Sequence, residues 1–290
     1  MMSNDIRVLV AEWPSNQFFN LAFEEAFYRA SDKPTMRFWR NDKVVVIGRL
    51  QSPVLEVNAL EALRYGVKLV RRFTGGGAVY HDLGNLNYAI VLPYADMNIE
   101  EAFKLVGEVI VEALKTLGLE KAYYRPLNDI EVDGLKISGL AATRSHDRVF
   151  VHGAMLVSSN IELLWRVLKI SSEKLIDKKL TQSRVKRVIT IREALGRSID
   201  PGEVQEAITS ALQRKLGLKP LNSDLSKKEL EQAVKLYWEK YSRPEWNLAF
   251  TEELRNLLTS EEYNALRLIS KPSPQQDEIV RRLEEIINEP

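Results

Sequence analysis

Residues 71–82 read Arg-Arg-Phe-Thr-Gly-Gly-Gly-Ala-Val-Tyr-His-Asp. Three consecutive glycines lose much backbone entropy on folding, so a chain keeps them where side chains do not fit. Their N–H groups can form a concave anion site, and Arg71 and Arg72 add cations that pair with phosphate or carboxylate oxygens. A flexible hairpin tip with a basic rim is the alternative interpretation. The spacing matches neither Gly-x-Gly-x-x-Gly nor the P-loop.

The neighbouring segments have the pattern of strands. Val67–Val70 and Leu86–Leu92 flank the glycines as short apolar runs. Two earlier runs, Met36–Arg40 and Lys43–Gly48, predict a hairpin that turns at Asn41-Asp42. The glycine-rich stretch is therefore expected to connect strands of a sheet.

Helical signals surround this region and dominate the second half of the chain. An apolar stripe behind the cap Asn98-x-x-Glu101 predicts a helix over residues 99–117. Mixed strands and helices occupy about 160 residues, and mostly helices follow. This order predicts an α+β fold with a mixed, largely antiparallel sheet flanked by helices, and with a helical C-terminal tail.

Lys136 is the second candidate for chemistry. It follows Asp133-Gly134, the strongest short hairpin signal in the chain, and lies between Leu135 and Ile137. Side chains alternate along a strand, so Lys136 faces away from these apolar neighbours. If they face the core, Lys136 points into a cleft or into solvent, and solvent is the more frequent place for a strand lysine. Ser138-Gly139 permits close backbone approach.

The composition excludes several classes of function. The 290 residues contain 41 Lys and Arg against 40 Asp and Glu, a net charge of +1, and no cysteine. The charge balance argues against a protein that coats nucleic acid, and the missing cysteine excludes disulfides, Fe–S clusters and thiol nucleophiles. The three histidines lack the spacing of metal ligands, and no Gly-x-Ser-x-Gly elbow is present.

No targeting or membrane segment is visible in the sequence, and we expect a cytoplasmic protein. The first residues lack the apolar region of a signal peptide, and the longest apolar runs fall far short of a span of about 20 residues. A basic run is interpreted as a solvated face, with docking of an acidic partner as the alternative. It comprises Lys178, Lys179, Arg184, Lys186 and Arg187.

Several motifs together resemble the lipoate–protein ligase A family. Residues 71–85, which end in His-Asp-Leu-Gly-Asn85, are similar to the family signature. The other similar motifs follow in order along the chain: Asn20-Leu-Ala-Phe-Glu-Glu25, Trp39-Arg40, residues 44–51, Asn128-Asp-Ile130, Lys136-Ile-Ser-Gly139, His152-Gly153, Tyr241-Ser242 and Glu245-Trp-Asn247. The resemblance covers about residues 8–248, so we expect a catalytic domain over 1–248 and a helical tail over 249–290.

The resemblance implies a fold shared with biotin protein ligases and class II tRNA synthetases. It also implies a reaction of two steps. Lipoate attacks the α-phosphate of ATP, which gives lipoyl-AMP and pyrophosphate. A lysine of an acceptor lipoyl domain, on a 2-oxoacid dehydrogenase E2 or glycine cleavage H protein, then attacks the anhydride, which gives an amide and AMP. Mg²⁺ is expected with ATP; its ligands are unassigned, although the carboxylates of Asp82 and Asp129 are near the motifs.

The resemblance also implies the site residues. Lys136 is the expected catalytic residue, because a cation there can contact both the phosphate and the lipoyl carbonyl oxygen. The expected ATP and lipoyl-AMP site comprises Arg71, Arg72, Thr74, Gly75, Gly76, Gly77, Ala78, Val79, Tyr80, Asn85, Asp129 and Lys136. The expected lipoate pocket comprises Val45, Ile47, Gly48, Arg49, His81, His152 and Gly153, with Val79 and Tyr80 as further walls.

Two departures from the family pattern bear on function. Thr74 stands where the family usually has serine, which keeps the hydroxyl group. Only 43 residues follow Asn247, too few for the small accessory domain of bacterial two-domain ligases. In such short versions adenylation can depend on a separate accessory protein. We therefore expect a catalytic subunit that needs such a partner for the first step.

Other functions are weighed against this one. A lipoyl or octanoyl transferase with a preformed acyl donor is the nearest alternative, but its thioester route needs a thiolate, which this chain lacks. A biotin ligase is disfavoured because no Gly-Arg-Gly-Arg-type loop is present. The intact Arg-Arg, Gly-Gly-Gly and Lys136 set argues against a non-catalytic lipoate-binding homologue. A nucleic-acid module is disfavoured by the near-zero net charge.

Overall fold

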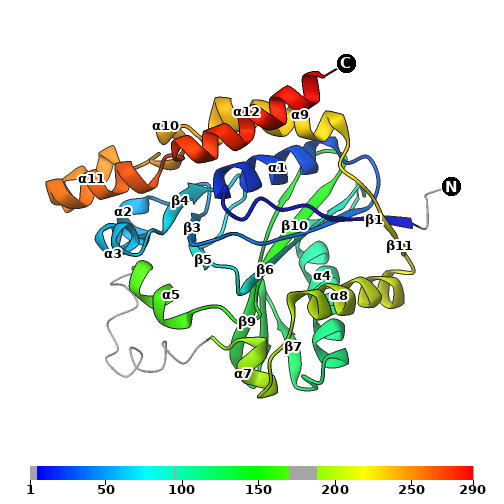
Figure 1. Ribbon diagram of the computed structural model, residues 1–290. Helices are drawn as coiled ribbons and strands as arrows, with labels where there is room; N and C mark the ends of the chain where they lie inside the picture. Colours follow the sequence, from blue (N-terminus) through cyan, green and yellow to red (C-terminus); the bar gives the residue numbers. More distant parts are fainter. Residues whose placement is uncertain (1–4, 95, 170–187, 290) are drawn as a thin grey trace.

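The computed structural model describes residues 5–94, 96–169 and 188–289 (Figure 1). The basic run over residues 178–187 lies outside the described residues. Within them, the large sheet has eight strands in the spatial order β11 (Lys219–Asn222), β1 (Asp5–Val10), β2 (Thr35–Trp39), β6 (Asn85–Leu92), β10 (Val149–Leu156), β9 (Leu135–Arg144), β8 (Asp129–Val132) and β7 (Ala122–Arg125). β1 runs parallel to β11 and β2, and the other neighbours are antiparallel. The predicted largely antiparallel α+β architecture is confirmed.

Helices cover both faces of the large sheet (Figure 1). On one face, α4 (Ile99–Thr116), α8 (Pro201–Leu216) and the short α7 (Ile191–Leu195) form a hydrophobic core with the strands. On the other face lie α1 (Gln17–Ala30) and α9 (Lys227–Leu236). The predicted capping box of α4 is present, since Asn98 accepts from the Glu101 N–H and Glu101 accepts from the Asn98 N–H.

A second, smaller sheet carries the glycine-rich segment. It consists of β4 (Lys68–Arg71), β3 (Val44–Ile47) and β5 (Val79–His81). A third core joins it to α2 (Pro53–Glu56), α3 (Ala59–Arg64), α5 (Ile161–Val167) and α11 (Ser260–Ile269). Figure 1 shows this group beside one end of the large sheet. The segment between β4 and β5 therefore faces the large sheet from a separate layer.

The hairpin predicted at Asn41-Asp42 is wrong. β2 lies in the large sheet and β3 in the small one, so the connection crosses between sheets. The Asn20 side chain on α1 donates to the Arg40 carbonyl and to Asn41 Oδ1, and Asn41 in turn donates to His81. These contacts hold the segment against α1 and β5, and residues distant in sequence supply them.

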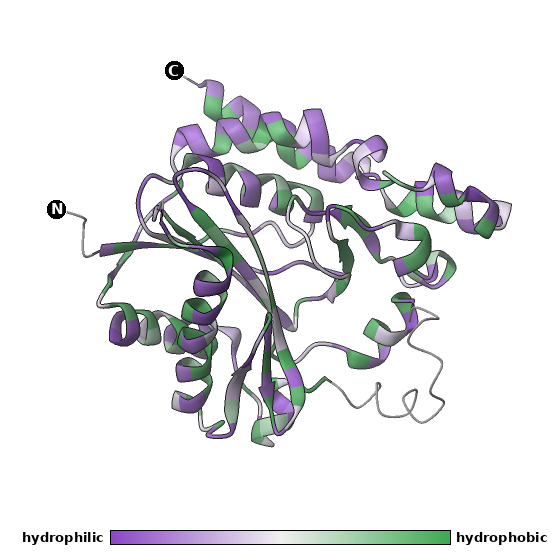
Figure 2. Ribbon diagram, turned by 180° about the vertical axis from the view of Figure 1, so that it is seen from behind, coloured by the Kyte–Doolittle hydropathy of each residue, from purple (hydrophilic) through white to green (hydrophobic). Residues whose placement is uncertain are grey.

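The end of the chain is helical, as predicted. After η2 (Tyr237–Tyr241) and α10 (Pro244–Asn247) come η3 (Glu252–Leu257), α11 and α12 (Pro274–Asn288). Val280 and Ile287 of α12 are buried in the core formed with α1 and α9. Apolar and polar residues alternate along α12 in Figure 2, which fits a helix that packs on one side. In the described part of the chain, no helix combines the length and apolar character needed to cross a membrane.

Candidate active site

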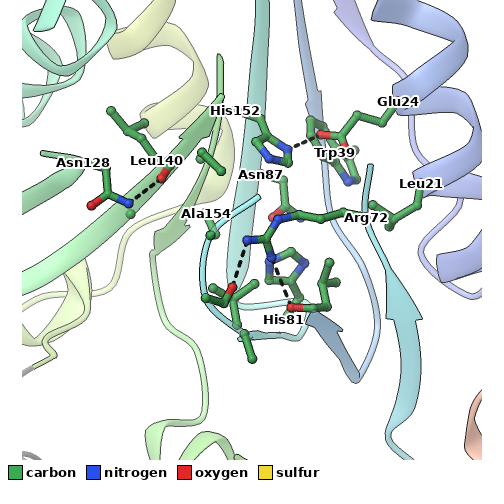
Figure 3. A pocket seen from close by; sticks show the side chains of 18 of the residues that line it. Leu21, Glu24, Trp39, Arg72, His81, Asn87, Asn128, Leu140, His152 and Ala154 are labelled. Atoms are coloured by element: carbon green, nitrogen blue, oxygen red, sulfur yellow. Dashed lines mark hydrogen bonds and ion pairs between the residues drawn. The ribbon is translucent and has the colours of Figure 1, made fainter. Parts of the chain in front are cut away.

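One pocket is lined by nine of the nineteen site residues predicted from the sequence (Figure 3). It lies between the α1 side of the large sheet and the inner side of the small sheet. The predicted residues that line it are Arg72, Gly76, Gly77, Ala78, Val79, His81, Lys136, His152 and Gly153. Residues up to 81 positions apart in the sequence, Arg72 and Gly153, thus meet because two sheets face each other.

Strand register builds the floor of the pocket. Trp39, Asn87, Ala154 and Gly139 lie directly opposite one another on β2, β6, β10 and β9. Strands are about 4.8 Å apart, so this row extends roughly 14 Å across the sheet. The small residues Ala154 and Gly139 occupy the middle and one end of the row, which leaves a trough above the backbone. His152, two residues before Ala154, lies on the same face.

Lys136 stands at the β9 end of this row. The predicted hairpin between β8 and β9 is present, with Asp133 and Gly134 at φ of 51° and 77°. Ile137 is fully buried, whereas the Lys136 side chain is 37% exposed and borders the pocket. Its Nζ lies 2.7 Å from Asp129 Oδ1.

Gly139 makes room for this lysine. A Cβ atom at Gly139 would lie 2.6 Å from Lys136 Nζ and 2.8 Å from its Cε. Any larger residue would displace the ammonium group, so glycine is what lets Lys136 lie across the floor. Asp129 is the carboxylate beside it, and the described residues contain no group of three His, Cys, Asp or Glu side chains that could hold a metal ion.

Arg72 braces the glycine loop from inside. Its guanidinium donates to the carbonyl oxygens of Gly75 at 2.6 Å and Gly77 at 2.9 Å, and its Nε donates to Thr74 Oγ1 at 3.1 Å. Gly76 has a φ of 92°, and a Cβ there would lie 2.8 Å from the guanidinium. Burial lowers the pKa of Arg72 to about 10, so the group stays charged at neutral pH. A fixed cation therefore lies under the predicted anion-binding loop.

A chain of buried hydrogen bonds continues from Arg72 across the pocket wall. His152 Nε2 lies 2.8 Å from Thr74 Oγ1, and its Nδ1 lies 2.7 Å from Glu24 Oε1 on α1. In the neutral imidazole, Nδ1–H donates to the Glu24 carboxylate and Nε2 accepts from the Thr74 hydroxyl, whose oxygen also accepts from Arg72. The chain fixes the imidazole tautomer and ties the glycine loop to α1.

Arg71 has a different environment from its neighbour. Its side chain is fully buried outside the pocket, and burial lowers its pKa to about 10. It donates to six backbone carbonyl oxygens, those of Gly48, Arg49, Gln51, Trp246, Asn247 and Ala249. Arg71 thus joins the loop after β3 to the segment around α10, and its guanidinium N–H groups donate to the backbone instead of to a ligand.

Several other predicted residues lie beside the pocket without lining it. Val45, Ile47 and Tyr80 pack in the core between the small sheet and its helices, whereas Val46 and Val79 face the pocket. Among the remaining predicted residues, Thr74 and Gly75 contact Arg72, and Asn85 donates to Asn87. Arg49 is exposed. Gly48 lies so close to Gly76 that a Cβ atom at Gly48 would lie 2.1 Å from the Gly76 carbonyl oxygen. Asp82 accepts from the N–H groups of Gly84 and Asn160.

Sequence reasoning assigned no site role to Glu24, Trp39 or Asn87, all of which line the pocket. Glu24 interrupts the apolar stripe of α1 and is fully buried, and a charge on the buried side of a helix is a signal for a functional partner. Asn87 stands on the same side of β6 as Ala89 and Val91, so alternation marks it as a polar residue on an apolar face. Trp39 carries no comparable signal.

Comparison with known proteins places this pocket in context. Residues 16–213 match the family model of the lipoyl protein ligase A/B catalytic domain. The chain is 37% identical over 257 residues to lipoate-protein ligase A subunit 1 of Thermoplasma acidophilum, covering 83% of this chain and 96% of that protein. A relative from Mycoplasma pneumoniae is 37% identical over 182 residues, covering 61% of this chain and 53% of the relative. The chain thus spans almost all of the first relative and about half of the second.

Solved structures are similar over most of the chain. A bi-partite lipoate protein ligase from the lipoylation system of T. acidophilum has a TM-score of 0.77 at 34% identity, covering 90% of this chain and 99% of that one. A T. acidophilum lipoate protein ligase with bound lipoic acid has a TM-score of 0.76 at 33% identity, covering 86% and 100%. Lipoate-protein ligase A bound with ATP also has a TM-score of 0.76 at 33% identity, covering 86% and 99%.

Proposed function

The chain belongs to the lipoate–protein ligase family, and from this premise we propose that it activates lipoate with ATP and transfers the lipoyl group to a lysine of an acceptor lipoyl domain. One observation supports the proposal most directly. Lys136 lies at the end of a trough that begins at the buried Trp39, and a glycine loop braced by Arg72 borders the same trough. An acyl chain and a phosphate thus have separate, adjoining places.

In the first step, a lipoate carboxylate oxygen forms a bond to the α-phosphorus of ATP while the bond from that phosphorus to pyrophosphate breaks. Negative charge grows on the α-phosphoryl oxygens, and a fixed cation stabilises it because no solvent has to reorganise. We assign this role to Lys136 and assign phosphate binding to the N–H groups of the glycine loop above Arg72. Asp129 holds the Lys136 ammonium at 2.7 Å until the phosphate arrives.

In the second step, the acceptor amine forms a bond to the lipoyl carbonyl carbon, and the bond from that carbon to the AMP oxygen breaks. The amine loses a proton to solvent, and AMP leaves as an anion. Lys136 is placed to donate to the carbonyl oxygen as its charge develops. Mg²⁺ on ATP phosphates commonly takes only one or two protein carboxylates. The Asp129 carboxylate beside Lys136 would be one such ligand, and the ion would neutralise phosphate charge.

We further propose that adenylation requires a separate accessory protein. The chain spans 96% of a Thermoplasma protein described as subunit 1 and 99% of a chain described as part of a bi-partite ligase with its E2 lipoyl domain. Residues 1–248 form the catalytic unit in this proposal and residues 249–290 form a tail, of which α11 packs on α3 and α12 packs on α1 and α9. We place the reaction in the cytoplasm, where ATP is available.

The test incubates the full chain with ATP, Mg²⁺, lipoate and a lipoyl domain, with and without a candidate accessory protein. The acceptor is weighed by mass spectrometry. We expect a lipoylated acceptor only when the accessory protein is present, and lipoylation by the chain alone when synthetic lipoyl-AMP replaces ATP and lipoate. A lipoyl domain whose acceptor lysine is replaced by arginine is the control. No lipoylation from lipoyl-AMP would contradict the transferase half of the proposal, and full activity of the chain alone would contradict the accessory requirement.

A further inference from the structure

Two further strands, β8 and β7, extend the trough floor beyond Lys136 to the last strand of the large sheet. Asp129 of β8 lies opposite Gly139, and Arg125 of β7 lies opposite Asp129, about 10 Å from Gly139 at the usual strand spacing. The neighbouring row consists of Lys136, Glu131 and Tyr123. On β7 and β8, the residues between these two rows pack toward α4, so both rows face the same side of the sheet as the trough.

A buried carboxylate fixes the two exposed side chains of this outer surface. Glu131 is 4% exposed, and it accepts from the Tyr123 hydroxyl and, at 2.8 Å, from Arg125 Nη1. Tyr123 is 43% exposed, and the Arg125 side chain is 62% exposed. A long exposed side chain loses entropy when a partner immobilises it, so side chains that are already held bind at a lower cost. Tyrosine and arginine are also enriched among the residues that dominate protein interfaces.

Leu127 adds an apolar side chain in the turn between β7 and β8. It is 82% exposed, more than any other large apolar side chain of the described residues, and its φ is 96°. Backbone of this kind suits glycine or asparagine and strains a leucine. The turn is nevertheless fixed, because Tyr124 Oη donates to the Leu127 carbonyl, and Asn128 pairs with the Leu140 backbone through its own side chain and carbonyl. Scattered exposed leucines are ordinary, but strained backbone that displays one beside a reaction site indicates a function.

Transfer of the lipoyl group brings the acceptor domain close to this turn. The Cα atoms of Leu127 and Asp129 are at most about 7 Å apart, and Asp129 Oδ1 lies 2.7 Å from Lys136 Nζ. An extended lysine side chain spans roughly 6 Å from Cα to Nζ at ordinary bond lengths, so the acceptor backbone comes that close to the lipoyl carbonyl at Lys136. The other end of the trough is closed by the buried Trp39, and Figure 3 shows Asn128, which follows Leu127, on the side of the pocket away from Trp39.

We propose that Tyr123, Arg125 and Leu127 form a docking surface for the acceptor lipoyl domain, here called the acceptor shelf. The partner is a folded domain that presents, beside its acceptor lysine, an apolar side chain to Leu127 and a carboxylate to Arg125. The proposal rests on the proposed function, because it takes the transfer step as given. The three residues lie outside the lining of the pocket, so affinity for the domain depends on them, whereas the reaction of a small amine does not.

The test measures transfer from synthetic lipoyl-AMP by the full chain to a folded lipoyl domain and to Nα-acetyl-lysine amide. Leu127→Asn removes the apolar contact and suits the positive φ, so the melting temperature of the variant should not fall. We expect the variant to raise KM for the lipoyl domain about tenfold and to change the rate with the small amine less than twofold. Leu221→Asn, on the exposed strand β11 at the opposite edge of the sheet, is the matched control and should change neither.

Arg125→Gln tests the charge of the acceptor shelf separately. Glutamine keeps a donor for Glu131 and removes the positive charge. A charge at the rim of an interface acts mainly through the salt dependence of association. Added NaCl should therefore increase KM for the lipoyl domain less in this variant than in the unmodified chain, and an identical salt dependence in both would overturn the carboxylate contact.

Other results would contradict separate parts of the proposal. An unchanged KM for the lipoyl domain in Leu127→Asn, or an equal loss with both amines, overturns the acceptor shelf. Slower pyrophosphate release in the presence of the accessory protein, with transfer unchanged, means that the accessory protein or the nucleotide occupies this surface, and it overturns the lipoyl domain as the occupant. No transfer by the unmodified chain to either amine overturns the proposed function itself. If Leu127→Asn does not fold, Leu127→Gly repeats the test, because glycine also accepts the positive φ.

Discussion

The two ends of the trough differ in charge and in exposure. At the β9 end, Lys136 and Asp129 are oppositely charged, partly exposed and free to exchange partners. At the β2–β6 end, Trp39, Asn87 and His81 are uncharged, buried and immobilised between two sheets. Charge is useful where a transient anion must be stabilised, and rigidity is useful where a ligand is recognised. In the proposed function, the reacting end and the end that holds the acyl chain are thus separate along one row of residues.

Lys136→Ala should have the largest effect, because it removes the positive charge at the β9 end of the trough. We expect lipoyl-AMP formation to fall by about 10²–10³-fold, the usual loss when one preorganised transition-state contact is removed. Affinity for lipoate should change less than threefold, because the other end holds the acyl tail. The rate is measured by pyrophosphate release with the accessory protein present, and affinity by calorimetry. A parallel loss of rate and affinity would show that the two ends are not separate.

His81→Gln tests whether the buried end of the trough is uncharged, through the pH dependence of the free energy of unfolding. The pKa of His81 falls from the ordinary 6.5 to about 3 on folding, so below pH 6.5 the unfolded chain binds a proton that the folded protein does not. The contribution of His81 to the free energy of unfolding is fully present above pH 6.5 and is lost as the pH falls toward 3. Between pH 7 and pH 5, protonation of His81 in the unfolded chain should lower the free energy of unfolding by about 2 kcal/mol. Denaturant unfolding of the variant should lack that decrease. Identical pH profiles would mean that His81 is protonated in the fold.

Gly139→Ala should have the smallest effect and should disturb only the reactive end. Its Cβ would displace Lys136 Nζ, which now lies 2.6 Å from that position. A displacement of this size should lower kcat about tenfold while KM for lipoate stays within twofold. In a Lys136→Ala background the same substitution should add almost nothing, and a double-mutant cycle with the steady-state rates measures this. An equal loss in both backgrounds would show that Gly139 acts on the fold and not on the lysine.

Two adjacent arginines show that the sequence did not predict which side of a strand faces the pocket. Arg71 and Arg72 are identical in type and share one motif, and both were predicted to bind phosphate. Arg71 is the last residue of β4, and the Arg72 N–H continues the pairing by donating to the Ile47 carbonyl. The two side chains therefore point to opposite sides, so Arg72 reaches the pocket while Arg71 binds six carbonyl oxygens behind it. The same alternation separates Val45 from Val46. Which side faces the ligand depends on the second sheet, and no local pattern specifies it.

Local signals were nevertheless reliable for much of the molecule. The Asp133-Gly134 turn, the capping box of α4 and the helical tail are present as predicted, because a few neighbouring residues specify each of them. The hairpin at Asn41-Asp42 failed because Asn20, some twenty positions earlier, holds the connection and sends β3 into another sheet.

The sequence by itself determined the order of strands and helices, the glycine loop, the strand lysine and, through the absence of cysteine, the exclusion of a thioester route. These features depend on spacing and composition, which are local. Only the tertiary structure decided that Trp39, Asn87, Ala154 and Gly139 form one row, because that row depends on the register of four strands. Register is set by packing across the whole sheet, and it places Trp39 and Asn87 at a fixed distance from Gly139, over which Lys136 lies.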